Sequence, residues 1–310
     1  MFNLLDILFK FDFWGSLLLG YPLNIILIIL IIFKTPKEME THSRILIQNC
    51  VLDILILTFQ MFMQVFYISD MDGNTIFIIT DGILIYFMKE TFNPLLFYYM
   101  NLFYIFIFNL NTNGLCVQFI YRYLILNRNM KIGVRRYFYM FSIAVIINVF
   151  YILDDIFAVI PYSKGGFKQI DDDNFNKILP YIQCKTIDMG MASIVLISFI
   201  EITPYFIIII CGIKMVKYVN SHAGIDQEMK RLLKQLTKTL IILAVVPFVK
   251  HAASLLIILF IETNNNMANI IRLIIYHLFH FTPVFNSIVC ILTNKPYRNA
   301  FLKSIRIVPQ

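Results

Sequence analysis

Charged residues are scarce in this chain of 310 residues. Asp, Glu, Lys and Arg together make up 15% of it, whereas hydrophobic residues make up 59%. A soluble globular chain has about 25% charged residues, and about half of its residues are apolar. The composition therefore excludes a soluble domain and indicates a protein that lies in a membrane.

The chain also lacks the patterns by which enzymes are recognised. It has no Gly-rich phosphate loop, no Cys or His spacing typical of a metal site and no nucleophile elbow. His277 and His280 share one face of a helical stretch, and we expect them to be packed or hydrogen-bonded rather than metal-bound. We therefore expect neither an enzyme nor a bound cofactor or metal.

Disulfides and glycans are not expected either. Four of the five cysteines fall in apolar stretches, and Cys184 alone lies in a segment expected outside the membrane. A single such cysteine has no partner on its side of the membrane, so no disulfide is predicted. The chain contains no Asn-x-Ser/Thr sequon, so we expect no N-glycosylation.

Long apolar runs are abundant. Runs without polar alternation, such as 24–33, are typical of membrane helices and exclude the strands of a membrane barrel. One helical crossing needs about 20 residues. We predict an all-α membrane protein, a single domain of seven transmembrane helices over 1–310, with helices near 14–33, 44–68, 94–121, 137–160, 187–213, 239–261 and 270–292.

Two further segments need a separate interpretation. The apolar segment 75–88 has 14 residues, which is short for a crossing, and we expect it at the rim of the bundle or in a small re-entrant turn. Residues 1–13 contain Asp6 and Asp12 and lack a basic n-region. We therefore expect no cleaved signal peptide, and the first helix serves as a signal anchor.

The basic residues are sorted between the loops. The stretches 34–44, 122–136, 214–238 and 294–310 hold 18 of the 26 Lys and Arg residues. Short basic loops stay in the cytoplasm, so the N-terminus is predicted outside and the C-terminus inside. The net charge of +7 is attributed to these clusters and their contact with anionic lipid, and no nucleic-acid partner is expected.

Polar side chains within membrane helices are costly and are therefore functional candidates. Asn24, Asp53 and Asn286 lie in the first, second and last predicted helices. They are expected to form a buried network that couples the positions of the helices. The alternative is a plain structural hydrogen bond between helices.

A second group of candidates lies toward the predicted outer ends of the helices. Pro247 removes a helical hydrogen bond and predicts a kink just before Lys250, for which Glu201 is the expected partner. A structural ion pair, or a lysine that reaches the interface, is the alternative. Aromatic rings suit an apolar pocket but also suit lipid contact. The ligand-binding candidates are Asp154, Glu201, Lys250, His251, Tyr99 and Phe103.

The predicted inner face holds the remaining candidates. The stretch 226–238 is charged and amphipathic, includes Arg231 and continues into the sixth helix. It is placed to transmit a helix movement to a partner, and the alternative is a solvated helix end. Tyr121-Arg122-Tyr123 ends the third helix.

Four segments together resemble one known family. They are 34–53, which begins Lys34-Thr35-Pro36-Lys37-Glu38-Met39; 121–126; 229–247; and Pro283 with Asn286 followed by 295–298. In this order they are similar to the corresponding parts of nematode serpentine chemoreceptors of the Str superfamily. The first inner loop is most similar to class delta, Srd.

The resemblance implies a G-protein-coupled receptor in the plasma membrane of chemosensory neurons, in their sensory cilia. It implies binding of a small odorant or water-soluble cue and activation of a heterotrimeric G protein. The switch and coupling candidates are then Asn24, Asp53, Arg122, Pro247, Asn286 and Arg231. The chain departs from the family pattern in one place, because residues 69–93 contain no cysteine. Tyr121 stands where rhodopsin-like receptors have an acid before the Arg, so an inner lock through that acid is not expected.

Two other functions fit a polytopic chain. A ligand-gated cation channel of the odorant-receptor type needs the opposite orientation, against the distribution of basic residues. A proton-coupled transporter would use Asp53 or Glu201 as its proton site, but the sequence has no visible internal repeat.

Epitope tags at residues 1 and 310 test the predicted orientation. We expect the first tag to be stained on intact cells and the second only after permeabilisation, because the basic loops hold the inner side in the cytoplasm. The reverse staining pattern would contradict the charge argument and favour the channel. Staining of both tags on one side would show that the count of crossings is wrong.

Overall fold

The computed structural model describes most of the chain. The residues outside this description are 1–3, 36–39, 70–74, 89–92, 129, 131, 159–162, 173–174, 185–190, 222–233, 235–236, 246–247, 250–251, 253–265 and 306–310. The elements are α1 (Leu4–Lys34), α2 (Glu40–Phe62), β1 (Gln64–Ser69), β2 (Thr75–Asp81), α3 (Ile83–Met88), α4 (Pro94–Arg128), α5 (Val134–Ala158), β3 (Ser163–Asp172), β4 (Phe175–Cys184), α6 (Met191–Ser221), α8 (Asn266–His280), α9 (Thr282–Thr293) and α10 (Lys295–Ile305).

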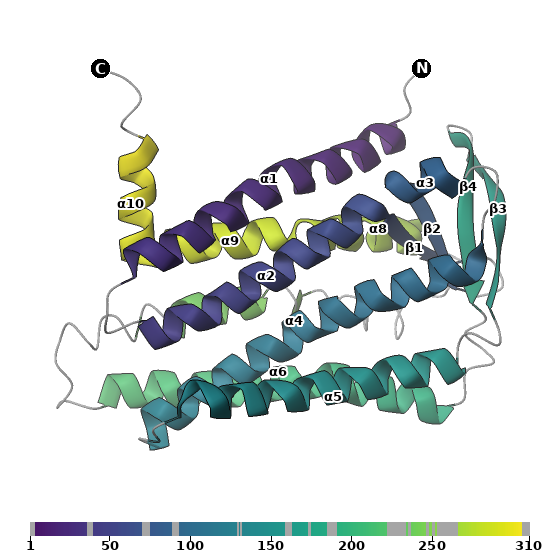
Figure 1. The fold of residues 1–310 in the computed structure, drawn as a ribbon. Helices are drawn as coiled ribbons and strands as arrows, with labels where there is room; N and C mark the ends of the chain where they lie inside the picture. Colours follow the sequence, from purple (N-terminus) through teal and green to yellow (C-terminus); the bar gives the residue numbers. More distant parts are fainter. Residues whose placement is uncertain are drawn as a thin grey trace.

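Long helices lie side by side along one axis, as Figure 1 shows. Among the described residues, α1, α2, α4, α5 and α6 are each long and apolar enough to cross a membrane. The pair α8 and α9 passes the same test as one span that is bent by 49°. The helical membrane bundle expected from the sequence is thus confirmed.

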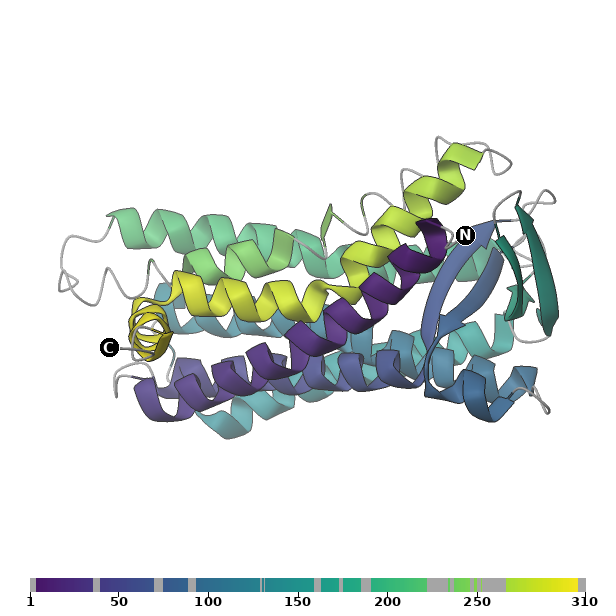
Figure 2. The same cartoon turned by 90° about the horizontal axis from the view of Figure 1, so that it is seen from above.

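The two ends of the bundle differ. The strands and the N-terminus lie at one end, here called the sheet end, and α10 lies at the opposite end, here called the tail end (Figure 1). Helix α6 runs from the sheet end to the tail end, and α8 begins again at the sheet end (Figure 2). The chain between α6 and α8 therefore has to return to the sheet end, which agrees with a seventh crossing.

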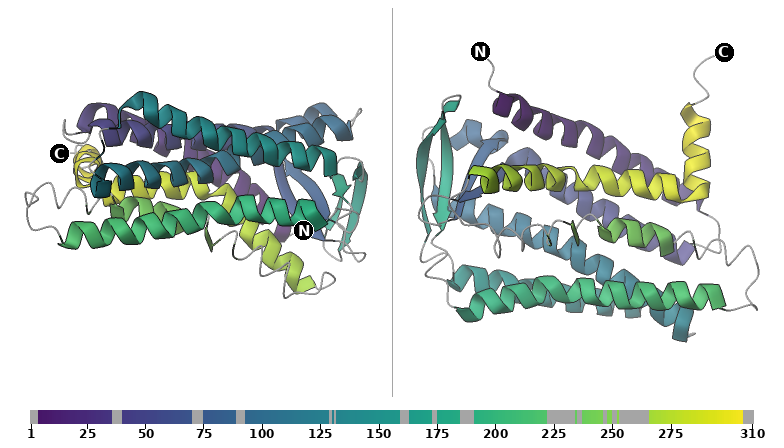
Figure 3. Two further views of the ribbon diagram at one scale, coloured as in Figure 1. Left: turned by 90° about the horizontal axis from the view of Figure 1, so that it is seen from below. Right: turned by 180° about the vertical axis from the view of Figure 1, so that it is seen from behind.

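Helix α4 is the central element. Its residues 107–119 are all buried, and it packs against α2, α5 and α6. Toward the tail end, an apolar core forms around Phe119 with Leu27, Met215 and Ile291 from three other helices. The views from below and from behind in Figure 3 show α4 enclosed by its neighbours.

Helix α1 begins at Leu4, before the start near residue 14 that the sequence predicts. The reason is a buried face that continues toward the N-terminus. Phe9, Phe13 and Leu17 recur every four residues and are all buried, so the segment 4–13 packs as a helix despite its two acids.

A four-stranded antiparallel sheet covers the sheet end, with strand order β1-β2-β4-β3. It is the main addition to the all-α architecture that the sequence predicts. Strands β1 and β2 are rich in β-branched and aromatic residues, and they bury Phe66, Ile76 and Ile78 against Phe9 of α1. The segment 75–88 thus forms β2 and α3 at the rim of the bundle and does not cross it.

The sheet joins two connections that are far apart in the sequence. Strand β2 lies in the connection after α2, and β4 lies in the connection before α6. The two strands pair over Thr75–Ile78 and Tyr181–Cys184, with Thr75 opposite Cys184. Backbone hydrogen bonds therefore hold the two connections together.

The sequence predicts one continuous last helix near 270–292, but the structure breaks this span into two helices. Helix α8 ends at His280 and α9 begins at Thr282, with Pro283 in the first turn of α9. Proline lacks a backbone N–H, so it cannot donate to the preceding turn, and its ring clashes with that turn. The bend places the two halves of the span against different partners.

Gly82, between β2 and α3, offers a test of this fold. It has φ +125°, and an added Cβ would lie 2.5 Å from the carbonyl oxygen of Phe62. We expect Gly82→Ala to destabilise the protein by about 1–3 kcal/mol, measured as a lower melting temperature in detergent. Gly133→Ala is the control, because no described atom lies within 4 Å of its added Cβ. Equal melting temperatures for the two variants would contradict the strained turn.

Candidate functional site

Buried polar residues gather in two clusters along the bundle axis. One surrounds Asp53 in the middle of the bundle, and the other surrounds Asp12 beneath the sheet. Each carboxylate is at most 1% exposed. Because burying a charge is costly unless it is paired and hydrogen-bonded, the partners of these two carboxylates define the candidate site.

The Asp53 cluster joins three helices. Oδ1 of Asp53 on α2 accepts a hydrogen bond from Nδ2 of Asn111 on α4 at 2.8 Å. Both carboxylate oxygens accept from Nδ2 of Asn286 on α9, at 3.0 and 3.1 Å. A movement of α9 relative to α2 would therefore break the hydrogen bonds between Asn286 and Asp53.

Asn24 contributes to the same region in a different way. Its Nδ2 donates to the carbonyl oxygen of Gly20 at 2.9 Å and to that of Pro283 at 3.3 Å. It therefore ties α1 to the bend between α8 and α9. Of the predicted three-residue network, the structure brings Asp53 and Asn286 into direct contact, and Asn24 binds the helix that carries Asn286.

The polar layer continues toward the tail end. Asn49 and Gln118 exchange hydrogen bonds between α2 and α4 at 2.5 and 3.4 Å. One turn further along α4, Arg122 is 2% exposed, and its Nε and Nη1 have no hydrogen-bond partner among the described residues. The phenols of Tyr121, Tyr137 and Tyr297 lie close enough to interact electrostatically with this buried guanidinium.

Tyr297 lies in the first turn of the tail-end helix α10 and anchors it. Its hydroxyl forms a hydrogen bond with Oγ1 of Thr35 at 2.9 Å. Burial raises the pKa of the Tyr297 phenol, which therefore remains a neutral hydrogen-bonding group.

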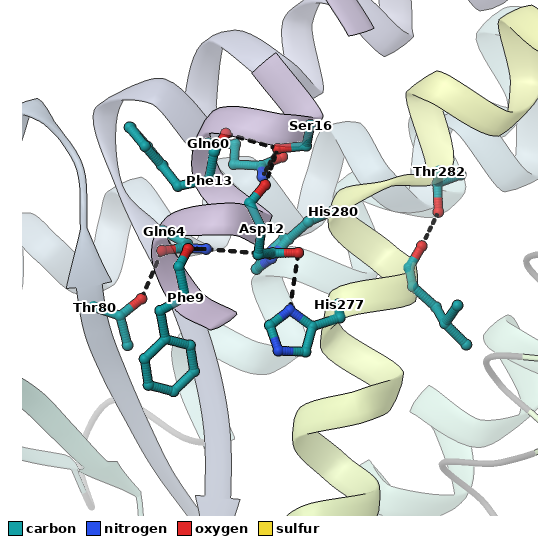
Figure 4. A network of polar contacts seen from close by, with 11 residues as sticks. Phe9, Asp12, Phe13, Ser16, Gln60, Gln64, Thr80, His277, His280 and Thr282 are labelled. Carbon is teal, nitrogen blue, oxygen red and sulfur yellow. Dashed lines mark hydrogen bonds and ion pairs between the residues drawn. The ribbon is translucent and has the colours of Figure 1, made fainter. Parts of the chain in front are cut away.

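The Asp12 cluster is drawn in Figure 4. Oδ2 of Asp12 accepts a hydrogen bond from Nε2 of Gln64 at 2.6 Å and another from Nδ1 of His280. Nδ1 of His277 lies 3.0 Å from Oδ1. One carboxylate thus links α1 to β1 and, through two imidazoles, to α8.

A second layer of hydrogen bonds holds this cluster in place. Oγ1 of Thr80 donates to Oε1 of Gln64 at 2.8 Å, which connects β2 to the cluster. Nε2 of Gln60 donates to Oγ of Ser16 at 2.6 Å, and Ser16 in turn donates to the carbonyl oxygen of Asp12 at 2.6 Å. The ring of Phe66 packs edge-on against His280, with centroids 5.0 Å apart. The surrounding apolar contacts exclude water, which strengthens the interactions inside the cluster.

Sequence reasoning did not find the role of Asp12. The acids of 1–13 are typical of a loop outside the membrane, and no local pattern pairs Asp12 with residues 268 positions away. A usable signal was the spacing of Asp12 and Ser16, which lie four residues apart and next to the apolar repeat of Phe9, Phe13 and Leu17. The contacts of His277 and His280 with Asp12 fit the expectation that these side chains are packed or hydrogen-bonded.

Comparison with known families gives a clear result. The sequence model described as serpentine type 7TM GPCR chemoreceptor Srd matches residues 11–303. The chain belongs to this Srd family. No curated protein matches the chain. The resemblance to class delta of the serpentine chemoreceptors is confirmed, and the Srd protein is a seven-transmembrane receptor and not an enzyme.

The ligand-binding candidates of the Srd receptor lie in different environments. Glu201 on α6 accepts a hydrogen bond from Tyr151 of α5 at 3.1 Å and lines a small cavity with Asn109, Thr112 and Asn113 of α4. Asp154 is partly buried near the sheet end of α5. The structure brings Glu201 together with the polar face of α4.

The aromatic candidates point elsewhere. Tyr99 and Phe103 are each 52% exposed on α4, and Phe103 packs against Phe59 and Phe106. Both rings lie on the outer surface of the bundle. This location supports the alternative of lipid contact over that of a pocket wall. Four other candidates, Lys250, His251, Pro247 and Arg231, lie outside the described residues.

Asp12→Ala tests whether the cluster holds the Srd receptor together. Removing the carboxylate leaves two imidazoles and Gln64 without their buried acceptor, so we expect a loss of roughly 3–5 kcal/mol of stability. The matched control on the same helix is Asp6→Ala, which breaks a partly exposed pair with Lys10 at 3.3 Å and is expected to cost at most about 1 kcal/mol. Melting temperature and surface expression report the difference, and similar values for both variants would refute the role of Asp12.

Proposed function

We propose that this Srd receptor binds a small chemical cue inside the bundle and activates a heterotrimeric G protein at the tail end. The observation that carries the proposal is the chain of buried polar contacts along α4. It begins where Glu201 and Asn109 line one cavity, continues with the hydrogen bonds of Asp53 to Asn111 and Asn286, and ends near Arg122. Membership in a family of G-protein-coupled chemoreceptors supplies the class of function.

The cue site is proposed around the cavity between α4 and α6. Its lining combines the carboxylate of Glu201 with the amides of Asn109 and Asn113 and the apolar side chains of Ile200 and Pro204. The cavity is about 10 Å³, room for about one water, so a cue has to part α4 and α6 to enter it. The mixture of few polar groups and apolar walls resembles the lining of small-molecule sites. It favours a small amphiphilic cue that has at least one hydrogen-bonding group.

The Asp53 cluster is the proposed switch. Binding favours one of two packings of the bundle when the cue has a higher affinity for that packing. Asp53 fixes α2, α4 and α9 through two amide side chains, so a shift of one helix is felt by the other two. The bend between α8 and α9 lets α9 move separately from α8.

The tail end is the proposed cytoplasmic face. Lys34, Arg128 and Lys217 lie where α1, α4 and α6 reach this end, and basic residues favour the cytoplasmic side. The buried guanidinium of Arg122 lies beneath the same face. We place the G-protein contact here, together with the predicted contribution of Arg231, and the receptor in the plasma membrane of chemosensory neurons, in their sensory cilia.

Glu201→Gln tests the cue site. The receptor is expressed with a promiscuous G protein and exposed to a panel of volatile and water-soluble compounds. For an active compound we expect about a 10- to 100-fold rise in the half-maximal concentration, because a hydrogen bond to a charged group contributes about 1.5–3 kcal/mol. Surface expression is expected to persist.

Tyr99→Ala is the control, because that ring lies on the outer surface of α4 and its loss is expected to leave the response unchanged. An unchanged response of Glu201→Gln would refute the proposed cue site. A current or an uptake signal in cells that lack the G protein would instead favour the channel or the transporter.

A further inference from the structure

A groove of about 540 Å³ runs along one side of α6, outside the polar clusters. Its walls are Ile209 and Ile213 of α6 on one side and Ile241 and Val245 on the other. The last two belong to the helical residues 237–245, which a hydrogen bond of 2.7 Å between Thr239 and Thr293 ties to α9. The groove therefore lies between two helices that face the bilayer.

The groove is deeper than an ordinary lipid-facing helix surface. Its floor is Phe119 of α4, which is fully buried, whereas Ile213 is 64% exposed at the mouth. A volume of about 540 Å³ lies within the range of small-molecule sites. Because the mouth opens toward hydrocarbon, the natural occupant is a chain of the surrounding lipid.

A charged side chain lies at one end of the groove. Lys217 is the one charged residue among the lining residues that the structure describes, and it lies toward the tail end of α6. Within the described part of the chain, no carboxylate is within ion-pair distance of Lys217. Its position, at the end of an apolar groove, matches an amphiphile that has an anionic headgroup.

Two comparisons within the molecule sharpen this assignment. Lys214 lies one turn earlier on α6, but its ammonium is over the ring of Tyr123, 5.5 Å from the centroid, and it does not line the groove. A second groove of about 440 Å³, beside Trp14 and Tyr21 of α1, has Asp81 as its ionisable residue. A carboxylate would repel an anionic headgroup, so the two grooves differ in the lipid that they fit.

We propose that the groove beside α6 is a binding site for an anionic phospholipid of the bilayer. One acyl chain lies between α6 and the helical residues 237–245, and the phosphate contacts Lys217. Lipid tails are as apolar as the groove, so entry of the chain gains little over its place in the bilayer. The preference for an anionic lipid therefore comes from Lys217.

An occupied groove would influence signalling. The lipid chain fills the space between α6 and the helical residues 237–245, so it stabilises the packing in which these two helices stand apart. A lipid with a higher affinity for one packing shifts the population toward it. The binding itself does not depend on coupling to a G protein, so its test stands apart from that of the proposed function.

Native mass spectrometry of the full-length receptor in detergent measures the binding. Phosphatidylserine and phosphatidylcholine with identical acyl chains are added in equal amounts. We expect about a fivefold preference for phosphatidylserine, the size of effect that one lysine near an anionic headgroup produces. Equal retention of both lipids by the unmodified receptor would overturn the proposal.

Charge variants identify the headgroup contact. Lys217→Gln is expected to abolish the preference for phosphatidylserine, Lys217→Arg to retain it, and Lys214→Gln to leave it unchanged. If Lys214→Gln and Lys217→Gln reduce the preference for phosphatidylserine equally, a generally basic surface attracts the lipid. That result would overturn the proposed site.

Variants that fill the groove identify the position of the chain. An added Cβ at Gly212 lies 3.5 Å from Cε1 of Phe119 and 4.0 Å from Cγ1 of Ile241, which is ordinary contact, so Gly212→Ala fits. Gly212→Leu extends into the groove and is expected to reduce binding of both lipids severalfold. Val245→Phe narrows the groove from the opposite wall. It replaces Gly212→Leu as the test variant if Gly212→Leu does not fold. Unchanged lipid binding in a folded filling variant would overturn the proposal.

Discussion

Inside a bilayer no water is available to a buried polar group, so such a group on one helix has to find its partner on another. Asp12 and Asp53 are the two points at which this constraint has the largest effect. Each carboxylate accepts hydrogen bonds from two other elements: Asp12 links α1 to β1 and α8, and Asp53 links α2 to α4 and α9. The apolar core fills the space between helices whose relative positions these contacts restrict.

The two carboxylates differ in the chemistry of their donors. Asp53 is bound by neutral amides, which carry no charge of their own. Asp12 faces two imidazoles, which can carry charge of their own. The sheet end and the middle of the bundle are therefore held by contacts of different kinds, although both depend on one buried acid.

Hydropathy and the distribution of basic residues are sufficient to predict the helical bundle, because a membrane helix leaves a long apolar run wherever it occurs. They also single out Asp53 and Asn286, since a polar residue in such a run is rare. They do not predict the Asp12 cluster, because Asp12 and His280 lie 268 positions apart and Asp12 lies at the margin of an apolar run. The sheet is missed because β3 carries lysines and aspartates typical of a loop, and its pairing with β4 depends on contacts at the end of the bundle.

The pairing of β2 with β4 joins the connection after α2 to the connection before α6 by backbone hydrogen bonds and by the packing of Ile76 and Ile78 with Leu179. Thr75 is the residue opposite Cys184, so the position across from that cysteine carries no thiol. The lifetime of this link is therefore set by temperature and by local unfolding, and reducing agents have no covalent bond to cleave between these two strands. The link between these two connections is therefore independent of the redox state of the medium around it.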